Sequence, residues 1–135
     1  MSVVKRHKVP LRSESDVVRA RQTVRSWSQE IGFTLVDTTK LVTAASELAR
    51  NTWDHGGGGD MELEVHDEGD RRGLRLVFID EGPGIADIDL AMRDGFTTGK
   101  GMGMGLGGSR RLVNDFEIES QPQRGTRVAI TRWRS

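Results

Sequence analysis

Two early stretches of the chain carry apolar residues three or four positions apart, the spacing of a helix that buries one face. The first stretch follows Ser13 or Ser15, either of which can cap a helix, and closes at Gly32, which suits a left-handed helix end. The second begins near Asp37, another good cap, and stops before the glycine run 56–59. The pattern predicts two long helices, with the glycine run as a flexible turn behind them.

Elsewhere the apolar positions alternate with polar ones, which is typical of half-buried strands. The strands expected from this alternation are residues 3–11, 61–66, 74–79, 116–120 and 126–133. Two short helices are expected as well, one over 88–93 and one from Leu106 onward. Helices and antiparallel hairpins together predict an α+β fold. We expect a two-layer α/β sandwich with the helices on one face of a mixed, largely antiparallel sheet.

Length and composition exclude several classes of protein. The 135 residues fit one domain, taken here as 1–135, and the absence of cysteine excludes disulfides, thiolate zinc sites and a cysteine nucleophile. The first residues contain no apolar signal segment, and no apolar run approaches the ~20 residues of a membrane span, so a cytoplasmic location is expected. Lysine plus arginine equals aspartate plus glutamate at 20 each, which argues against nucleic acid or membrane as a partner.

Charge is nevertheless uneven along the chain. Residues 1–30 hold seven lysines and arginines against three acidic residues. A solvated helix face is the favoured interpretation of this excess, and a docking surface for a protein partner is the alternative.

The second predicted helix carries Glu47 and Asn51 four positions apart, so both side chains lie on one side, one turn from each other. An asparagine oxygen is a hard ligand that suits Mg²⁺, and a nearby carboxylate can accept a proton from a hydroxyl. A solvated helix face would show the same spacing. The pair alone therefore leaves both interpretations open.

Two further motifs combine polar residues with glycine. Asp80 ends a buried-looking strand and is followed by Gly82 and Gly84, so its carboxylate can bind a ligand above a turn of bare backbone, although a surface turn has the same pattern. The run GMGMGLGG over 101–108 leads into a helix, where backbone N–H groups can face an anion. The run is not a Walker loop, because the Lys-Ser/Thr ending is missing.

Taken in order, these segments resemble a known family. The motifs SELARN, DEGPGI and DGFTTGKGMGMGL are similar to the N, G1 and G2 boxes of the GHKL ATPase superfamily, which groups gyrase, heat-shock chaperones, histidine kinases and MutL. With the ending GTRVAITRW, they look closest to its small anti-sigma-factor serine kinases, in particular the stressosome switch kinases (RsbT type). The resemblance implies a Bergerat-type sandwich that binds ATP between helices and sheet.

The resemblance also implies roles for individual residues. Asn51 would hold Mg²⁺ and Glu47 would be the general base toward a serine or threonine hydroxyl. Asp80 would accept a hydrogen bond from the adenine amino group, with the glycines of its motif beneath the base. Thr126 would support the adenine end through water. Residues 95–105 would form a lid over the nucleotide.

The phosphate end of the implied site lies in the glycine-rich run. The residues expected around the phosphates are Gly101, Gly103, Gly105 and the Leu106 amide, and Lys100 would add a charge there. No segment matches the phosphorylated helix pair of histidine kinases, so an autophosphorylating sensor is not expected.

The function that this resemblance implies is an ATP- and Mg²⁺-dependent protein serine/threonine kinase that acts as a partner switch. Its substrates would be STAS-domain antagonist or scaffold proteins, and its partners would include a PP2C-type phosphatase or a sigma factor. Two alternatives stay open: a non-catalytic module that binds nucleotide and sequesters a sigma factor or activates a phosphatase, and an ATPase that transfers phosphate to water. Glu47 favours the kinase, because a pure binder needs no base beside its metal ligand.

Overall fold

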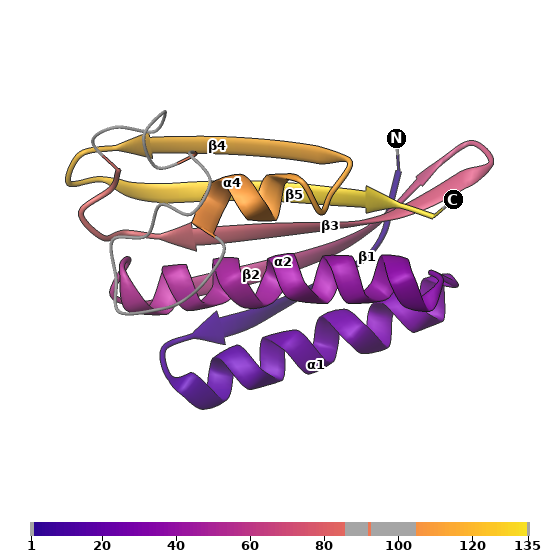
Figure 1. The fold of residues 1–135 in the computed structure, drawn as a ribbon, viewed down its shortest axis with the longest axis horizontal. Coiled ribbons are helices and arrows are strands. Elements are labelled where there is room, and N and C mark those ends of the chain that lie inside the picture. The colour runs from indigo at the N-terminus through magenta and orange to yellow at the C-terminus, as the bar shows by residue number, and fades with distance from the viewer. Residues whose placement is uncertain (1, 86–91, 93–104, 135) are drawn as a thin grey trace.

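The computed structural model describes residues 2–85, 92 and 105–134. Its elements are β1 (Ser2–Leu11), α1 (Glu14–Ile31), α2 (Leu35–Asp54), β2 (Gly59–Glu68), β3 (Arg71–Asp80), α4 (Gly105–Arg110), β4 (Asp115–Gln121) and β5 (Gly125–Trp133), as Figure 1 shows. Both long helices and all five strands expected from the sequence are present. The short helix expected over 88–93 lies, apart from residue 92, outside the described residues. Among the described helices, none has the length and apolarity that crossing a bilayer requires.

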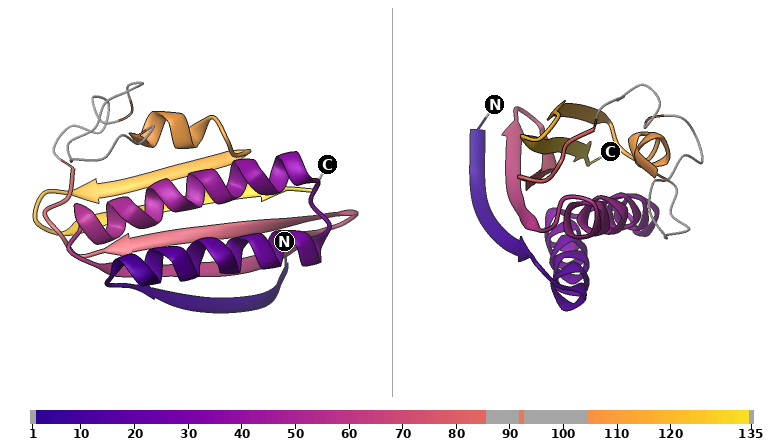
Figure 2. Two further views of the ribbon diagram at one scale, coloured as in Figure 1. Left: turned by 60° about the horizontal axis from the view of Figure 1, so that its bottom comes forward. Right: turned by 90° about the vertical axis from the view of Figure 1, so that its left-hand side faces the viewer.

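The five strands form one sheet in the order β1-β2-β3-β5-β4. All four pairings between these strands are antiparallel. Helices α1 and α2 lie side by side on one face of the sheet, and the shorter α4 packs against α2 (Figure 2). The expected two-layer sandwich is therefore confirmed.

The core lies between the two helices and the sheet. Alternate residues of the central strands, such as Leu63 in β2 and Leu76 in β3, are fully buried beneath the helices. From the other layer, α2 buries Leu41 and Leu48 at the helical spacing read from the sequence. Burying side chains of this size stabilises the fold by roughly 1.5–3 kcal/mol each, so the packing of α2 on the sheet holds the functional face of that helix in place.

The ends of α1 agree with the sequence. The Ser13 side chain caps the helix by accepting a hydrogen bond from the Asp16 amide at 3.2 Å. Gly32 ends it at φ +96°, a conformation that costs glycine little. Local capping chemistry therefore determines both boundaries of this helix.

The start of α2 differs from the prediction that Asp37 caps it. Thr34 is the cap, and its hydroxyl accepts the Asp37 amide at 3.1 Å. Asp37 is buried and pairs instead with Arg132 of β5, whose guanidinium also donates to the Leu112 carbonyl at 2.8 Å. Both candidate residues are good caps, and this contact with β5, remote in sequence, decides between them.

We expect the Asp37→Ala variant to lower the free energy of unfolding by about 3 kcal/mol, because it leaves the largely buried Arg132 guanidinium without its carboxylate. Urea denaturation measures the loss. The control Thr34→Ala removes only the cap and should cost about 1 kcal/mol. Replacing both partners, Asp37→Ala with Arg132→Met, should recover part of the loss. Equal losses in the two single variants would contradict a role for the ion pair.

Candidate functional site

The site lies at the C-terminal end of β3, the central strand of the described sheet. Asp80 is the last residue of β3 and stands between Gly59 of β2 and Thr126 of β5 in the strand register. The C-terminal end of α2 reaches the same region, because Gly56 just beyond that helix touches Asp80. Three segments far apart in the sequence therefore meet around one carboxyl group.

The Asp80 carboxyl group is half-buried and held by backbone donors. Its Oδ1 accepts a hydrogen bond from the Gly82 amide at 2.9 Å, and the Thr126 amide donates to the group as well. Burial raises the pKa of Asp80 above its ordinary value, and these two hydrogen bonds oppose the rise. The backbone donors of Gly82 and Thr126 thus fix the direction of this carboxyl group.

Glycines surround Asp80 so closely that side chains there would collide. A Cβ on Gly56 would lie 2.4 Å from the Asp80 Cγ, and one on Gly82 would lie 2.6 Å from the Gly56 carbonyl oxygen. Gly125 has φ +100°, and a Cβ there would lie 2.1 Å from the Asp80 carbonyl oxygen. We call Gly56, Gly82 and Gly125 the glycine cradle. At each of the three positions, protein atoms around Asp80 occupy the space where a side chain would stand.

The glycine cradle corrects the interpretation of 56–59 as a mere flexible turn. Gly56 is bound in place, since its amide donates to the Asn51 carbonyl at 3.1 Å while its backbone contacts Asp80. At the other end of the run, a Cβ on Gly59 would lie 1.9 Å from the Ile79 carbonyl oxygen. The only signal in the sequence was the position of the glycines directly after the helix that carries Asn51.

Ser120 of β4 was missed by the sequence reasoning. Its hydroxyl oxygen lies 2.9 Å from that of Thr126 and accepts the Ile85 amide at 2.7 Å. It also donates to the Gly125 carbonyl at 3.1 Å. Ser120 therefore joins the end of the Asp80 motif to the start of β5 and orients Thr126. A serine in an alternating strand carries no pattern that would have revealed this.

On α2, the expected pair Glu47 and Asn51 lies one turn apart, and both side chains are half-buried. The Asn51 backbone carbonyl accepts the amides of His55 and Gly56. Gly56 in turn contacts Asp80. The structure thus connects the α2 motif to the Asp80 motif through a single glycine.

The remaining predicted residues are only partly described. Gly84, at φ +78°, packs against the Gln121 carbonyl oxygen at the turn between β4 and β5. Gly105 begins α4, and the Leu106 side chain is buried in the core. Lys100, Gly101 and Gly103 lie outside the described residues, as does nearly all of the expected lid.

The side chains of Asp80, Asn51 and Glu47 fit the ligand that the sequence implies, which is ATP with Mg²⁺. A carboxylate acceptor suits a planar base with an amino group, because that group can donate a hydrogen bond to Asp80. Asn51 offers the kind of side-chain oxygen atom that Mg²⁺ prefers, and Glu47 lies one turn away on α2. The chemistry of these side chains is thus compatible with a nucleotide base at Asp80 and a metal ion at Asn51.

Comparison with known proteins agrees with this arrangement. Residues 36–134 match HATPase_c, the family of histidine kinase-, DNA gyrase B- and HSP90-like ATPases. The serine/threonine-protein kinase RsbT of Bacillus subtilis is 40% identical over 125 residues, which are 93% of this chain and 94% of that protein. An anti-sigma F factor of Thermoanaerobacter is 31% identical over 120 residues, 84% of this chain and 82% of that protein.

Solved structures share the fold. The RsbU and RsbW domains of a Mycobacterium tuberculosis protein align with a TM-score of 0.63 and 21% identity, over 98% of this chain and 34% of that one. The SiaB–SiaC complex of Pseudomonas aeruginosa aligns with a TM-score of 0.53 and 11% identity, over 97% and 90%. The sequence match over most of the chain and the site built around Asp80 lead to one conclusion: the chain belongs to the HATPase_c family, the GHKL-type ATPases.

Proposed function

We propose that this chain is an ATP-dependent protein serine/threonine kinase that acts as a partner-switching regulator in a bacterial stress or sigma-factor pathway. The observation that carries the kinase assignment is Glu47, one turn before Asn51 on the helix that borders the glycine cradle. A carboxylate at that position can serve as a base, which a protein that only binds nucleotide does not need. The 40% identity to a serine/threonine-protein kinase over 93% of the chain supports the same activity.

In this proposal, Asp80 accepts a hydrogen bond from the adenine amino group, and Gly82 and Gly84 let the base lie close to the backbone. The raised pKa of Asp80 reflects a carboxyl group withdrawn from water, where a hydrogen bond discriminates strongly between bases. Thr126, oriented by Ser120, supports the same end of the site through water. Recognition of the base therefore depends on β3, β5 and the end of α2.

The catalytic end is assigned to α2 and to the segment that leads into α4. Bound ATP would supply the phosphoryl group, and Mg²⁺ would neutralise the negative charge of the phosphates. Asn51 would hold the metal through its side-chain oxygen, and Glu47 would accept the proton of the substrate hydroxyl. Lys100 and the backbone amides of Gly101, Gly103, Gly105 and Leu106 would donate to the phosphates.

We infer the partners from the similarity to serine/threonine kinases and anti-sigma factors. Substrates are STAS-domain proteins, whose phosphorylation places negative charge in the interface and weakens the complex. The chain released in this way engages a PP2C-type phosphatase or a sigma factor in the cytoplasm. A second function, direct sequestration of a sigma factor, is favoured by relatives named anti-sigma F factor at 31% identity.

Substitutions on α2 separate binding from chemistry. Glu47→Ala should bind ATP nearly as the unaltered chain does and transfer phosphate about 10²–10⁴-fold more slowly, because it loses only the base. Asn51→Ala should lose both properties, because the metal loses its ligand from the protein. Calorimetry with ATP and Mg²⁺, beside a phosphotransfer assay on a STAS-domain protein, measures the two effects.

The outcome for Glu47→Ala decides between the functions. Phosphate transfer at the unaltered rate would remove Glu47 as the base and favour the sigma-factor binding module. Release of free phosphate without labelled protein would instead indicate an ATPase.

Asp80→Asn should weaken ATP binding by up to about a hundredfold, because the side-chain amide has only one acceptor oxygen, which the Gly82 amide already uses, and its NH₂ group would face the amino group of the base. A buried amino group without an acceptor costs ~1–3 kcal/mol. The same variant should raise the melting temperature of the nucleotide-free protein at neutral pH. The pKa of Asp80 is raised in the folded chain, so the folded chain holds the carboxyl proton more tightly than the unfolded chain does. Ionisation of Asp80 therefore destabilises the fold as the pH rises from the unfolded pKa through the folded pKa.

Thermal melts of both proteins between pH 3 and pH 8 check this stability effect. The higher melting temperature of Asp80→Asn should be fully expressed at neutral pH and should vanish below about pH 4, the ordinary pKa of an aspartate.

An ATP affinity of Asp80→Asn equal to that of the unaltered chain would contradict the role of Asp80 in binding.

Gly56→Ala should abolish ATP binding at concentrations that saturate the unaltered chain, because the new methyl group must displace the Asp80 carboxyl group 2.4 Å away. Gly57→Ala is the matched control. Gly57 has φ +74° and nothing within 4 Å of its Cβ position, so this change adds backbone strain of ~1–2 kcal/mol but leaves the site intact. Binding isotherms and melting temperatures for both variants separate the two effects. Equal losses of ATP affinity in both would argue against the glycine cradle.

A further inference from the structure

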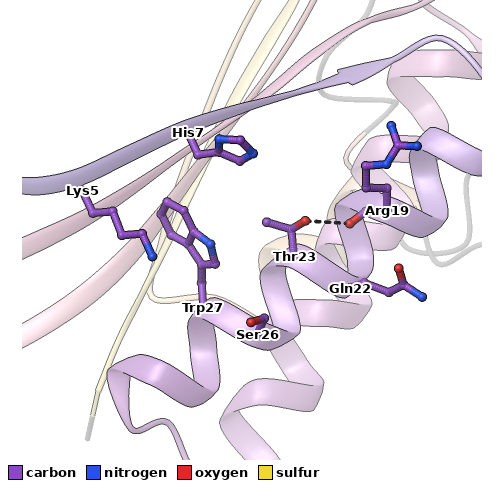
Figure 3. Close-up of a pocket in the computed structure, with 7 residues that line it drawn as sticks. All are labelled: Lys5, His7, Arg19, Gln22, Thr23, Ser26 and Trp27. Carbon is purple, nitrogen blue, oxygen red and sulfur yellow. Dashed lines mark hydrogen bonds between the residues drawn. The ribbon is translucent and has the colours of Figure 1, made fainter.

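A second recess lies between β1 and α1. Its volume is about 430 Å³, and Lys5 and His7 of β1 face five residues of α1 between Arg19 and Trp27 across it (Figure 3). We call it the β1–α1 groove. It lies at the β1 edge of the sandwich, whereas α4 packs on α2 toward the other edge (Figure 2).

The β1–α1 groove is basic and built around an indole ring. The Lys5 ammonium lies 4.1 Å from the centre of the Trp27 ring, and the His7 ring lies 6.1 Å from it. Lys5 and Arg19 supply positive charge, and none of the described residues that line the groove is acidic. Charge in the groove thus complements an acidic ligand.

The two cations already have partners, but these ion pairs are weak. Lys5 pairs with Glu30 and Arg19 with Asp16, each at 3.2 Å, and the two cationic side chains are 49% and 62% exposed. Exposed pairs of this kind contribute about 0–1 kcal/mol. An incoming carboxylate can therefore replace them at little cost.

Strand β1 offers a second element of recognition. It is the edge strand of the described sheet and pairs only with β2, so half of its backbone hydrogen-bonding groups face away from the sheet. Lys5, Arg6, His7 and Lys8 are consecutive and all exposed. A strand with this sequence repels a second copy of itself, because antiparallel pairing of β1 with β1 would place like charges opposite one another.

We propose that β1 and the β1–α1 groove together bind an extended acidic segment of a partner protein, which adds to the sheet as a strand beside β1. The backbone of β1 supplies the hydrogen bonds, and Lys5 and Arg19 bind carboxylates of the segment from the groove side. This surface is separate from the region around Asp80, so a partner can be held whether or not that site is filled. The proposal does not depend on the kinase assignment.

The first test uses the unaltered chain and a ten-residue peptide of alternating glutamate and threonine, titrated into isotopically labelled protein. Amide shifts should concentrate at residues 4–8 and along the groove side of α1, with the Trp27 indole among them, and amide exchange in β1 should slow. A peptide of alternating lysine and threonine should produce no such shifts. Shifts scattered over every basic surface would overturn the proposal. Protection of β1 that grows with protein concentration and needs no peptide would point to a second copy of the chain instead.

The second test uses charge reversal with a matched control. The double variant Lys5→Glu, Arg19→Glu should weaken peptide binding by about tenfold or more at low salt, and the difference should shrink as salt is added. Arg25→Glu is the control, because Arg25 is exposed on the same helix but does not line the groove. An equal loss of affinity in Arg25→Glu would overturn the proposal. The peptide comparison on the unaltered chain stands even if the double variant fails to fold.

Discussion

The approach of Gly56 to the Asp80 carboxyl group is the constraint on which the rest of the site depends. Only a residue without a side chain allows the end of α2 to reach the end of β3, since a Cβ on Gly56 would stand 2.4 Å from Asp80. The same glycine donates to the Asn51 carbonyl, so the two motifs are held together by one backbone contact. Packing of α2 over the central strands holds both partners in place, because the helix cannot shift without opening the core.

The buried Asp80 carboxyl group lowers the stability of the fold when it is ionised. Its burial raises its pKa and opposes ionisation, and the amides of Gly82 and Thr126 offset only part of that penalty. An apolar residue at this position would avoid the penalty but would remove the acceptor to which we assign recognition of the nucleotide base. Ordinary core positions, by contrast, carry apolar side chains that gain from burial.

The sheet order separates the two regions to which we assign binding. Asp80 ends the central strand β3, flanked by β2 and β5 and covered by α2, which suits a small ligand held from several sides. Strand β1 lies at the edge, with one row of backbone groups unpaired in the described sheet and a basic groove beside it. An edge of this kind suits an extended chain. In our two proposals, nucleotide and the protein partner are therefore bound on different surfaces.

The sequence by itself determined the elements and the motifs, because helical and strand periods, the Ser13 cap and the Gly32 helix end depend on neighbours within a few residues. It also placed Glu47, Asn51 and Asp80, whose spacing within their segments resembles a known family. Their chemical roles stay predictions, as do those of Lys100, Gly101 and Gly103. Only the tertiary structure decided that Thr34 rather than Asp37 caps α2, that Gly56 encloses Asp80, that Ser120 orients Thr126, and that β1 is an edge. Each of these depends on contacts between residues far apart in the chain, and no local pattern encodes such contacts because they exist only once the sheet and the helices have packed.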